Sequence, residues 1–362
     1  MGCHTAKAGK PYAGGAPLKT PFGTIHGTNI TPDPETGIGG WSLEAFSRAM
    51  KEGVDREGKH LWPAFPYDHF TKTTDEDLAA LYAFIMTREP VKQKNVGNSV
   101  PLPRATAGLW KSKYLERGVY KPDPAKSTEW NRGAYLVEGL GHCGACHTPR
   151  DHLGAEKKDA RLAGAEIEGW HAPALGSSSP SPMPWTVEAM ATYLKHGIAD
   201  QHAQTAGPMS DVVHDLSHVN DADVHAIAAY VVSLDQRTAD ERKQAGEAAL
   251  QRARAAMAQR GNAIYDGACA DCHNLGRGQE GGALELPLGT ALTVPTSLNL
   301  AHIIREGILP REGERGGWMP AFEGALTDAQ LTDLLTYLRA LSGQPAWPDV
   351  AGEVKKITKD ER

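Results

Sequence analysis

The sequence predicts an all-α protein built from three small tandem domains with long loops. Three features support this prediction. A short cysteine and histidine pattern recurs along the chain, and a stretch of helical apolar spacing follows each occurrence. The chain of 362 residues also contains 39 glycines and 24 prolines, which suit small domains with long loops.

The repeated stretch is expected to form the last helix of each domain. The three copies begin after residues that can cap a helix, Thr74, Asn220 and Thr327, and Asp, Asp or Gln follows three residues later. Apolar residues then recur at helical spacing, at Leu78, Leu81 and Ile85, at Val224, Ile227 and Val231, and at Leu331, Leu334 and Leu338. An aromatic residue occupies the same place in each copy, at Phe84, Tyr230 and Tyr337. We expect these side chains to form the core of each domain.

A shorter helix is predicted at the front of two of the domains. It covers residues 130–138 in the second domain and 259–265 in the third, with a glycine early and an aromatic side chain facing inward. The predicted organisation places domains at residues 1–95, 126–236 and 249–345, linkers at 96–125 and 237–248, and a polar tail at 346–362. The first linker is rich in proline, and the second is a charged run that is expected to be helical.

The cysteine and histidine pattern is Cys-x-x-Cys-His. It occurs at Cys143, Cys146 and His147 and again at Cys269, Cys272 and His273. This spacing is typical of covalent haem attachment, because two thiols one helical turn apart can add to the two vinyl groups of one porphyrin. The histidine then lies under the iron as the proximal ligand. A zinc half-site or a redox dithiol would not explain why both cysteine pairs are followed by histidine.

The start of the chain contains a remnant of the same pattern, in Cys3 and His4. In this frame Met1 and Gly2 fill the two spacer positions, and the first cysteine would precede Met1. We therefore expect a chain truncated at its N-terminus that carries three covalently bound haem c groups. The fifth cysteine is then the remaining half of a third motif rather than part of a disulfide framework.

Domains of the class I cytochrome c type usually offer a methionine thioether as the sixth iron ligand, from the loop before the last helix. The third domain has Met319 at this place, eight residues before Thr327, and the second has Met209, eleven residues before Asn220. Both lie beside proline in otherwise polar loops, so iron ligation is a better interpretation than core packing.

The first domain departs from this pattern, because Phe65 stands where the methionine is expected. Its methionines Met50 and Met86 are expected to lie inside helices. We predict His69, four residues after Phe65, as the sixth ligand, which would give iron with two histidine ligands and a lower potential. A five-coordinate haem, another donor, and a surface position for His69 are the alternatives.

Charge and hydropathy restrict the possible partners. The formal net charge of −6 argues against nucleic acid as a partner. The chain has no run of eighteen apolar residues, which predicts no membrane-spanning helix within it. Because c-type haem is attached outside the bacterial cytoplasm, we expect a periplasmic protein, associated with the membrane through a partner or through a missing N-terminal segment.

Several short runs in the first domain resemble a known family. They are Pro21–Ile25, Thr28–Asp33, Gly37–Trp41 and Pro63–Tyr67. These runs are similar to the triheme cytochrome c subunit of bacterial membrane-associated dehydrogenases, and the similarity covers nearly the whole chain. The resemblance implies an electron-transfer subunit, rather than an enzyme, that passes electrons from a catalytic dehydrogenase subunit through three haems to quinone or a terminal acceptor. Phe65, followed by Tyr67–Phe70, resembles the cytochromes that accompany molybdenum hydroxylases more than those of alcohol dehydrogenases.

Two other functions remain open at this stage. A multihaem peroxidase would need one haem with an open distal side, and the first haem is the candidate because it lacks a methionine. A free-standing electron shuttle would need no dedicated partner. The roles of two further groups of residues are also left undecided. Asn29 and Thr31 could bind a haem propionate or form a turn. The other histidines of the second domain are expected to be mostly surface or capping residues: His142, His171, His196, His202, His214, His218 and His225.

Overall fold

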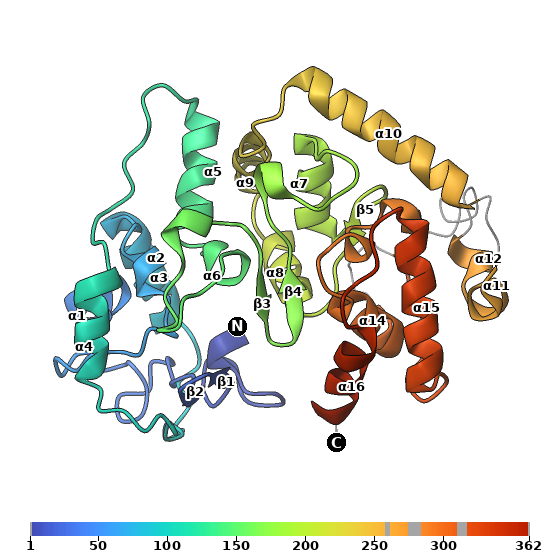
Figure 1. Ribbon diagram of the computed structural model, residues 1–362. Helices are drawn as coiled ribbons and strands as arrows, with labels where there is room; N and C mark the ends of the chain where they lie inside the picture. Colours follow the sequence, from blue (N-terminus) through green and yellow to red (C-terminus); the bar gives the residue numbers. More distant parts are fainter. Residues whose placement is uncertain (1, 258–260, 274–283, 310–316, 361–362) are drawn as a thin grey trace. The chain divides into compact units, whose positions relative to one another are not determined.

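The computed structural model describes residues 2–257, 261–273, 284–309 and 317–360. The described chain is mainly helical (Figure 1), which confirms the all-α prediction. Its strands pair in short two-stranded antiparallel sheets between the helices. None of the helices in the described ranges is long and apolar enough to cross a membrane.

The chain divides into two compact units. The first contains residues 1–127, 134–145 and 150–158, and the second contains residues 128–133, 146–149 and 159–362. The division passes through helix α5 (Thr128–Glu138) and through helix α6 (Gly144–His147). This division does not test the predicted limits of the three domains, which remain a prediction.

The first unit contains the predicted first domain and the whole of the predicted linker at 96–125. Its elements are η1 (Gly2–His4), β1 (Pro17–Thr20), β2 (Gly23–His26), α1 (Leu43–Glu52), α2 (Tyr67–Phe70), α3 (Asp75–Met86) and α4 (Thr106–Tyr114). Helix α4 lies inside the segment 96–125 that the sequence suggested as a proline-rich linker. Its Lys111 is buried and donates hydrogen bonds from Nζ to the carbonyl oxygens of Glu52 (2.7 Å) and Gly53 (3.0 Å), so this segment packs on α1.

The predicted last helix of the first domain is α3. The Thr74 side chain accepts a hydrogen bond from the Asp77 amide, as expected of a cap. Leu78 and Ile85 are buried in a core with Phe46 and Met50. The prediction for Phe84 was wrong: this ring is 46% exposed and lies under the guanidinium of Arg88 at 4.1 Å. The helix turns this position toward solvent, where the cation covers one face of the ring.

The second unit contains most of the remaining elements. They are η2 (Lys158–Ala160, at the division), β3 (Ala165–Ile167), β4 (Trp170–Ala172), η3 (Gly176–Ser178), α7 (Val187–His196), β5 (Ile198–Ala199), β6 (Ala203–Gln204), α8 (Pro208–Ser217), α9 (Asp221–Ser233), α10 (Ala239–Met257), α11 (Ala263–Ala268), α12 (Ala270–His273), η4 (Leu286–Leu288), η5 (Thr290–Leu292), α14 (Leu298–Glu306), α15 (Asp328–Leu341) and α16 (Val350–Asp360).

Helices α9 and α15 are the predicted last helices of the second and third domains, and both begin where their caps indicate. Asn220 accepts from the Asp223 amide at the start of α9, and Thr327 forms a complete capping box with Gln330 at the start of α15. The start of α5 crosses α9 so closely that a Cβ on Gly133 would overlap the carbonyl oxygen of Ala226. The early glycine of the front helix therefore permits this crossing.

The predicted front helix of the third domain is shifted along the chain. The sequence placed it at residues 259–265, and the structure has α11 at Ala263–Ala268, while residues 259 and 260 lie outside the described residues. The charged run expected to be helical forms the long helix α10. The predicted polar tail contains α16, which buries Val354 and Ile357 in the same core as α15.

Candidate haem sites

The third cysteine and histidine motif lies at an apolar cavity. Helix α12 supplies His273, and Cys269 lies immediately before this helix, while α14 and α15 supply leucine and isoleucine side chains. The cavity has about 470 Å³ of unfilled space, part of it open to solvent. Its lining consists of Ile264, Ala268, Cys269, His273, Leu286, Leu300, Ile303, Ile304, Met319, Phe322, Leu326, Leu334 and Leu338. The lining is apolar apart from the ligand-type side chains Cys269, His273 and Met319.

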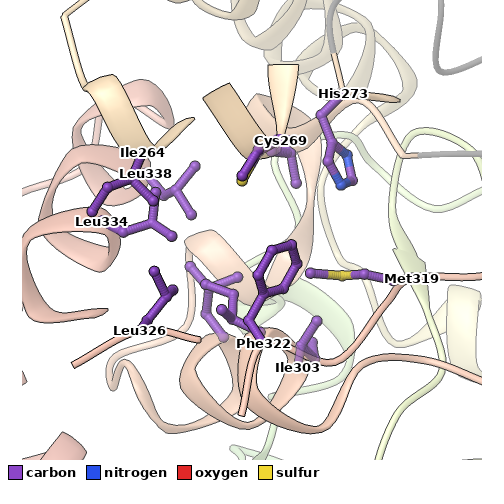
Figure 2. A pocket seen from close by; sticks show the side chains of 13 residues that line it. Ile264, Cys269, His273, Ile303, Met319, Phe322, Leu326, Leu334 and Leu338 are labelled. Atoms are coloured by element: carbon purple, nitrogen blue, oxygen red, sulfur yellow. The ribbon is translucent and has the colours of Figure 1, made fainter. Parts of the chain in front are cut away.

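The cavity brings Met319 to the same place as His273, although the two are 46 residues apart in the sequence. Figure 2 shows the methionine side chain reaching into the cavity below His273, with Phe322 beside it. The backbone of Met319 is fixed by a reciprocal pair of hydrogen bonds with Ile308, of 2.9 and 3.0 Å. An imidazole, a thiol and a thioether in one apolar cavity are the donor set that a c-type haem requires, so the residues present fit this group.

The histidines of all three motifs make the same hydrogen bond. The Nδ1 atom of His4 donates to the carbonyl oxygen of Thr28 (2.7 Å), and that of His147 donates to Pro173 (2.7 Å). The Nδ1 atom of His273 donates to Leu284 (3.2 Å). A carbonyl can only accept, so the proton is on Nδ1 and the lone pair is on Nε2. Histidines that bind a metal are normally oriented by a bond of this kind.

The protonation of these three rings is consistent with ligation. Burial lowers the pKa of His4, His147 and His273 below the ordinary value of 6.5. An imidazole with a lowered pKa stays neutral at pH 7, and only the neutral ring has a lone pair for a metal.

The first motif is a short turn at the start of the chain. Helix η1 ends at His4, and Cys3 is exposed, while Met1 lies outside the described residues. The His4 carbonyl accepts a hydrogen bond from the Gly14 amide (2.8 Å). A Cβ on Gly27 would overlap the Cys3 carbonyl, so the segment after β2 runs directly against this turn.

The second motif straddles the division of the chain, with Cys143 in the first unit and Cys146 and His147 in the second. Its predicted methionine, Met209, is half-buried in the first turn of α8. The assignments of Met209 and of the second motif as iron ligand and haem attachment site stay predictions.

The cysteines of the motifs are thiols and not disulfides. Cys3 and Cys272 are exposed, whereas Cys143, Cys146 and Cys269 are half-buried. Burial raises the pKa of the Cys269 thiol to about 11, so it stays protonated at neutral pH in the haem-free chain.

The predicted sixth ligand of the first haem, His69, is 6% exposed and has partners on both ring nitrogens. Nδ1 donates to the Glu138 carbonyl (2.9 Å), and Nε2 lies 2.7 Å from Oε1 of Glu156. Asp68 lies close enough that Asp68, His69 and Glu156 could together hold a metal ion. Ligation of haem iron by His69 would require the ring to leave Glu156, and the assignment stays a prediction.

Phe65, which replaces the expected methionine, packs on the apolar core of the first unit and lies 5.3 Å from Phe70 between ring centroids. Asn29 is held by hydrogen bonds within the first unit, and the choice between a turn and a haem propionate stays open. Its amide group donates to the carbonyls of Val91 (2.8 Å) and Gln93 (3.1 Å), and its Oδ1 accepts from the amide and hydroxyl of Thr31.

Sequence reasoning missed the carbonyl partners of the motif histidines. Thr28, Pro173 and Leu284 act through their backbone oxygens, so their side chains give no signal. It also expected His202 to be a surface or capping residue, and this was wrong, because the ring is 6% exposed and stacked on Trp185.

Comparison with known proteins agrees with the geometry. A family model described as cytochrome C oxidase, cbb3-type, subunit III matches residues 256–338, which contain the third motif and Met319. The gluconate 2-dehydrogenase cytochrome c subunit of Pantoea cypripedii is 38% identical over 100% of this chain and 87% of its own length. The fructose dehydrogenase cytochrome subunit of Gluconobacter japonicus is 35% identical over 98% of this chain and 79% of its own.

A third relative is larger. It is a nicotinate dehydrogenase subunit of Pseudomonas putida, which is 42% identical over 98% of this chain, but the chain spans 30% of that protein. The motifs and the matched family define a c-type cytochrome with covalently bound haem. The chain belongs to the family of cytochrome c subunits of bacterial dehydrogenases, which transfer electrons and are not the catalytic subunits.

Proposed function

We propose that this chain carries three haem c groups and passes electrons from a catalytic dehydrogenase subunit to quinone or a terminal acceptor. The haems are attached at Cys3, at Cys143 with Cys146, and at Cys269 with Cys272. When bound, each haem supplies an iron that accepts and releases one electron. The protein acts on the periplasmic side and is held at the membrane by its partner or by a further segment.

The observation that carries the proposal is the hydrogen bond shared by His4, His147 and His273. Each ring is neutral, is held through Nδ1 by a backbone carbonyl, and keeps the Nε2 lone pair for a metal. The remnant motif at the start of the chain has the same arrangement as the two complete motifs, which supports three haems rather than two.

Sulfur ligation by Met209 and Met319 completes the second and third sites. A neutral thioether favours ferrous iron and raises the potential. In the third site Phe322, Leu326 and Leu334 give the cavity that Met319 enters an apolar lining. The first site lacks a methionine, and with His69 as its sixth ligand its potential is the lowest of the three.

We propose a molybdenum hydroxylase as the catalytic partner. The support is the 42% identity to the nicotinate dehydrogenase subunit, together with Phe65 and the sequence from Tyr67 to Phe70. Co-expression with neighbouring reading frames followed by affinity purification tests this: the catalytic subunit that copurifies is expected to contain molybdenum. Copurification of a flavin- or quinone-containing subunit would contradict the molybdenum hydroxylase and identify the partner as a dehydrogenase of another class.

Counting haems tests the main proposal. The chain is exported with a haem attachment system, and haem per chain is measured by the pyridine haemochrome method and by mass spectrometry. We expect three haems, and two when Cys269 and Cys272 are both replaced by alanine. His142→Ala, next to the second motif but outside it, is the matched control and keeps all three. Two haems or fewer per native chain would contradict the proposal of three.

Spectroscopy tests the sixth ligand of the first haem. Two histidine ligands predict an electron paramagnetic resonance signal that disappears in His69→Ala, while the near-infrared sulfur–iron band is unchanged. A sulfur–iron band assigned to the first haem would exclude His69.

In the peroxidase alternative, the first haem would be the site of peroxide turnover. Phe65 cannot bind its iron, and His69 has other partners in the structure. Electron transfer alone predicts essentially no turnover of hydrogen peroxide by the isolated protein. Turnover that persists in Met209→Ala and Met319→Ala would favour the peroxidase.

A further inference from the structure

The two segments that carry Met209 and Met319 are joined to each other in the second unit. Gln204, at the end of β6 and five residues before Met209, donates a hydrogen bond from Nε2 to the carbonyl oxygen of Gly317 (2.7 Å). Gly317 precedes Met319 by two residues. A side chain of one methionine segment therefore holds the backbone of the other.

A second contact acts directly on the segment before Met209. Gly207 has φ +56 and ψ −144, a conformation that residues with a side chain avoid. A Cβ at this position would also overlap the indole of Trp170 in β4. The Gly207 backbone therefore lies directly on the indole ring, two residues before the predicted sulfur ligand.

Trp170 is in turn held by the helix that lines the cavity of the third motif. Its indole stacks on the imidazole of His302 in α14, with centroids 4.7 Å apart and an interplanar angle of 17°. His302 Nδ1 lies 2.5 Å from Oε1 of Glu306 one turn later, which fixes the ring. Ile303, the next residue of α14, lines the cavity.

Further bonds join β4 to α14 beside this stack. Asn299 accepts from the amide of His171 (2.7 Å) and donates to its carbonyl (2.8 Å). A second pair joins η5 to the turn between β5 and β6, where Thr290 donates to the carbonyl of His202 from its amide (2.8 Å) and from its hydroxyl (2.9 Å). The contact between the two methionine segments is thus part of an ordered interface and not an isolated approach.

We propose that Trp170 and Gln204 are positioning residues, which present Met209 to the second haem through contacts that the third domain supplies. The inference rests on the proposed function, because it requires Met209 to be an iron ligand. Methionine is flexible, and its sulfur stays at the iron only if the backbone before it is fixed. Trp170, supported by His302, contacts this backbone at Gly207, and the bond to Gly317 holds the same segment at Gln204.

The consequence is that a substitution in the third domain changes the ligation of the second haem. His302 is far along the sequence from Met209 and belongs to neither cysteine motif. In His302→Ala the indole loses its support, and the ratio of sulfur-ligated to unligated second haem is expected to fall about two- to tenfold, as for the loss of one aromatic contact.

The test uses the full-length holoprotein in a Met319→Ala background, where the near-infrared sulfur–iron band reports Met209 alone. Trp170→Ala and His302→Ala are expected to reduce this band and to lower the potential of the second haem. Trp170→Phe keeps a flat ring against Gly207 and is expected to restore both. Trp130→Ala is the matched control, because Trp130 makes an edge-on aromatic contact with Tyr230 in the same unit.

The possible failures are distinct. If Met209→Ala in the same background leaves the band unchanged, Met209 is not the ligand, and both the ligand assignment and the positioning role are overturned. If Met209→Ala removes the band but Trp170→Ala and His302→Ala keep it with unchanged potential, only the positioning role is overturned. Gln204→Ala, which removes a single hydrogen bond, supplies the same readouts should Trp170→Ala fail to accumulate.

Discussion

His202 makes the stability of the second unit sensitive to acid. The imidazole is 6% exposed, stacks on Trp185 with centroids 3.8 Å apart, and shares a hydrogen bond with the Ser181 hydroxyl (2.9 Å). Burial lowers its pKa from the ordinary 6.5 to about 4. The ring is therefore neutral in the folded protein at a pH where it is already protonated in the unfolded chain.

The sign and the size follow from this difference. Between pH 6.5 and about 4 the unfolded chain binds more protons than the folded one, so the free energy of unfolding falls as the pH falls. At about 1.4 kcal/mol per pH unit, the full contribution is about 3 kcal/mol, and about 2 kcal/mol of it is lost between pH 7.5 and pH 5. The contribution is fully present above pH 6.5 and absent below about pH 4.

Urea unfolding of the holoprotein at several pH values measures this effect against His202→Phe. Phenylalanine keeps a flat ring on Trp185 but has no proton to bind. We expect the loss of unfolding free energy between pH 7.5 and pH 5 to be about 2 kcal/mol smaller in His202→Phe than in the native protein. His152→Phe, the same change at an exposed position, is the control for the substitution itself. Equal pH dependence in native protein and His202→Phe would refute the reasoning.

Three further predictions concern stability and thiol reactivity. Arg339→Met removes hydrogen bonds from a buried guanidinium to the carbonyls of Pro345, Leu292 and Val294, and is expected to lower the unfolding free energy in urea by about 3–5 kcal/mol. Asn29→Ala removes the amide that donates to the carbonyls of Val91 and Gln93, with an expected loss of unfolding free energy of about 3 kcal/mol in the same assay. In the haem-free chain at pH 8, Cys269 should react with iodoacetamide about 100-fold more slowly than an ordinary thiol with a pKa of 9.0, as read by mass spectrometry.

Each of these has a definite contrary outcome. If Arg339→Met lowers the unfolding free energy by less than about 1 kcal/mol, water replaces the guanidinium as the donor to these carbonyls. Unchanged stability of Asn29→Ala would mean that Thr31 and Thr36 can hold the turn alone. Alkylation of Cys269 as fast as that of the exposed Cys272 would show that α12 opens in the haem-free chain.

Local sequence was sufficient for the elements that local forces decide. The caps Thr74, Asn220 and Thr327 start their helices where predicted, because a side-chain oxygen two or three residues from an orphan amide is a short-range interaction. The exposure of Phe84 was not predictable in this way. Its place in the repeat matches that of the buried Tyr230, and only the packing around each helix distinguishes the two.

The sequence by itself determined the kind of chemistry. Two cysteines and a histidine at fixed spacing can be recognised without a fold, because the spacing is a property of one helical turn, and the methionines could be selected by their place before a capped helix. Only the tertiary structure decided what surrounds these residues. The carbonyls that orient the motif histidines, the cavity shared by His273 and Met319, the burial of His202 and the contact between the two methionine segments all join residues distant in sequence. Such contacts depend on how the helices pack, and backbone carbonyls carry no side-chain signal by which they could be found beforehand.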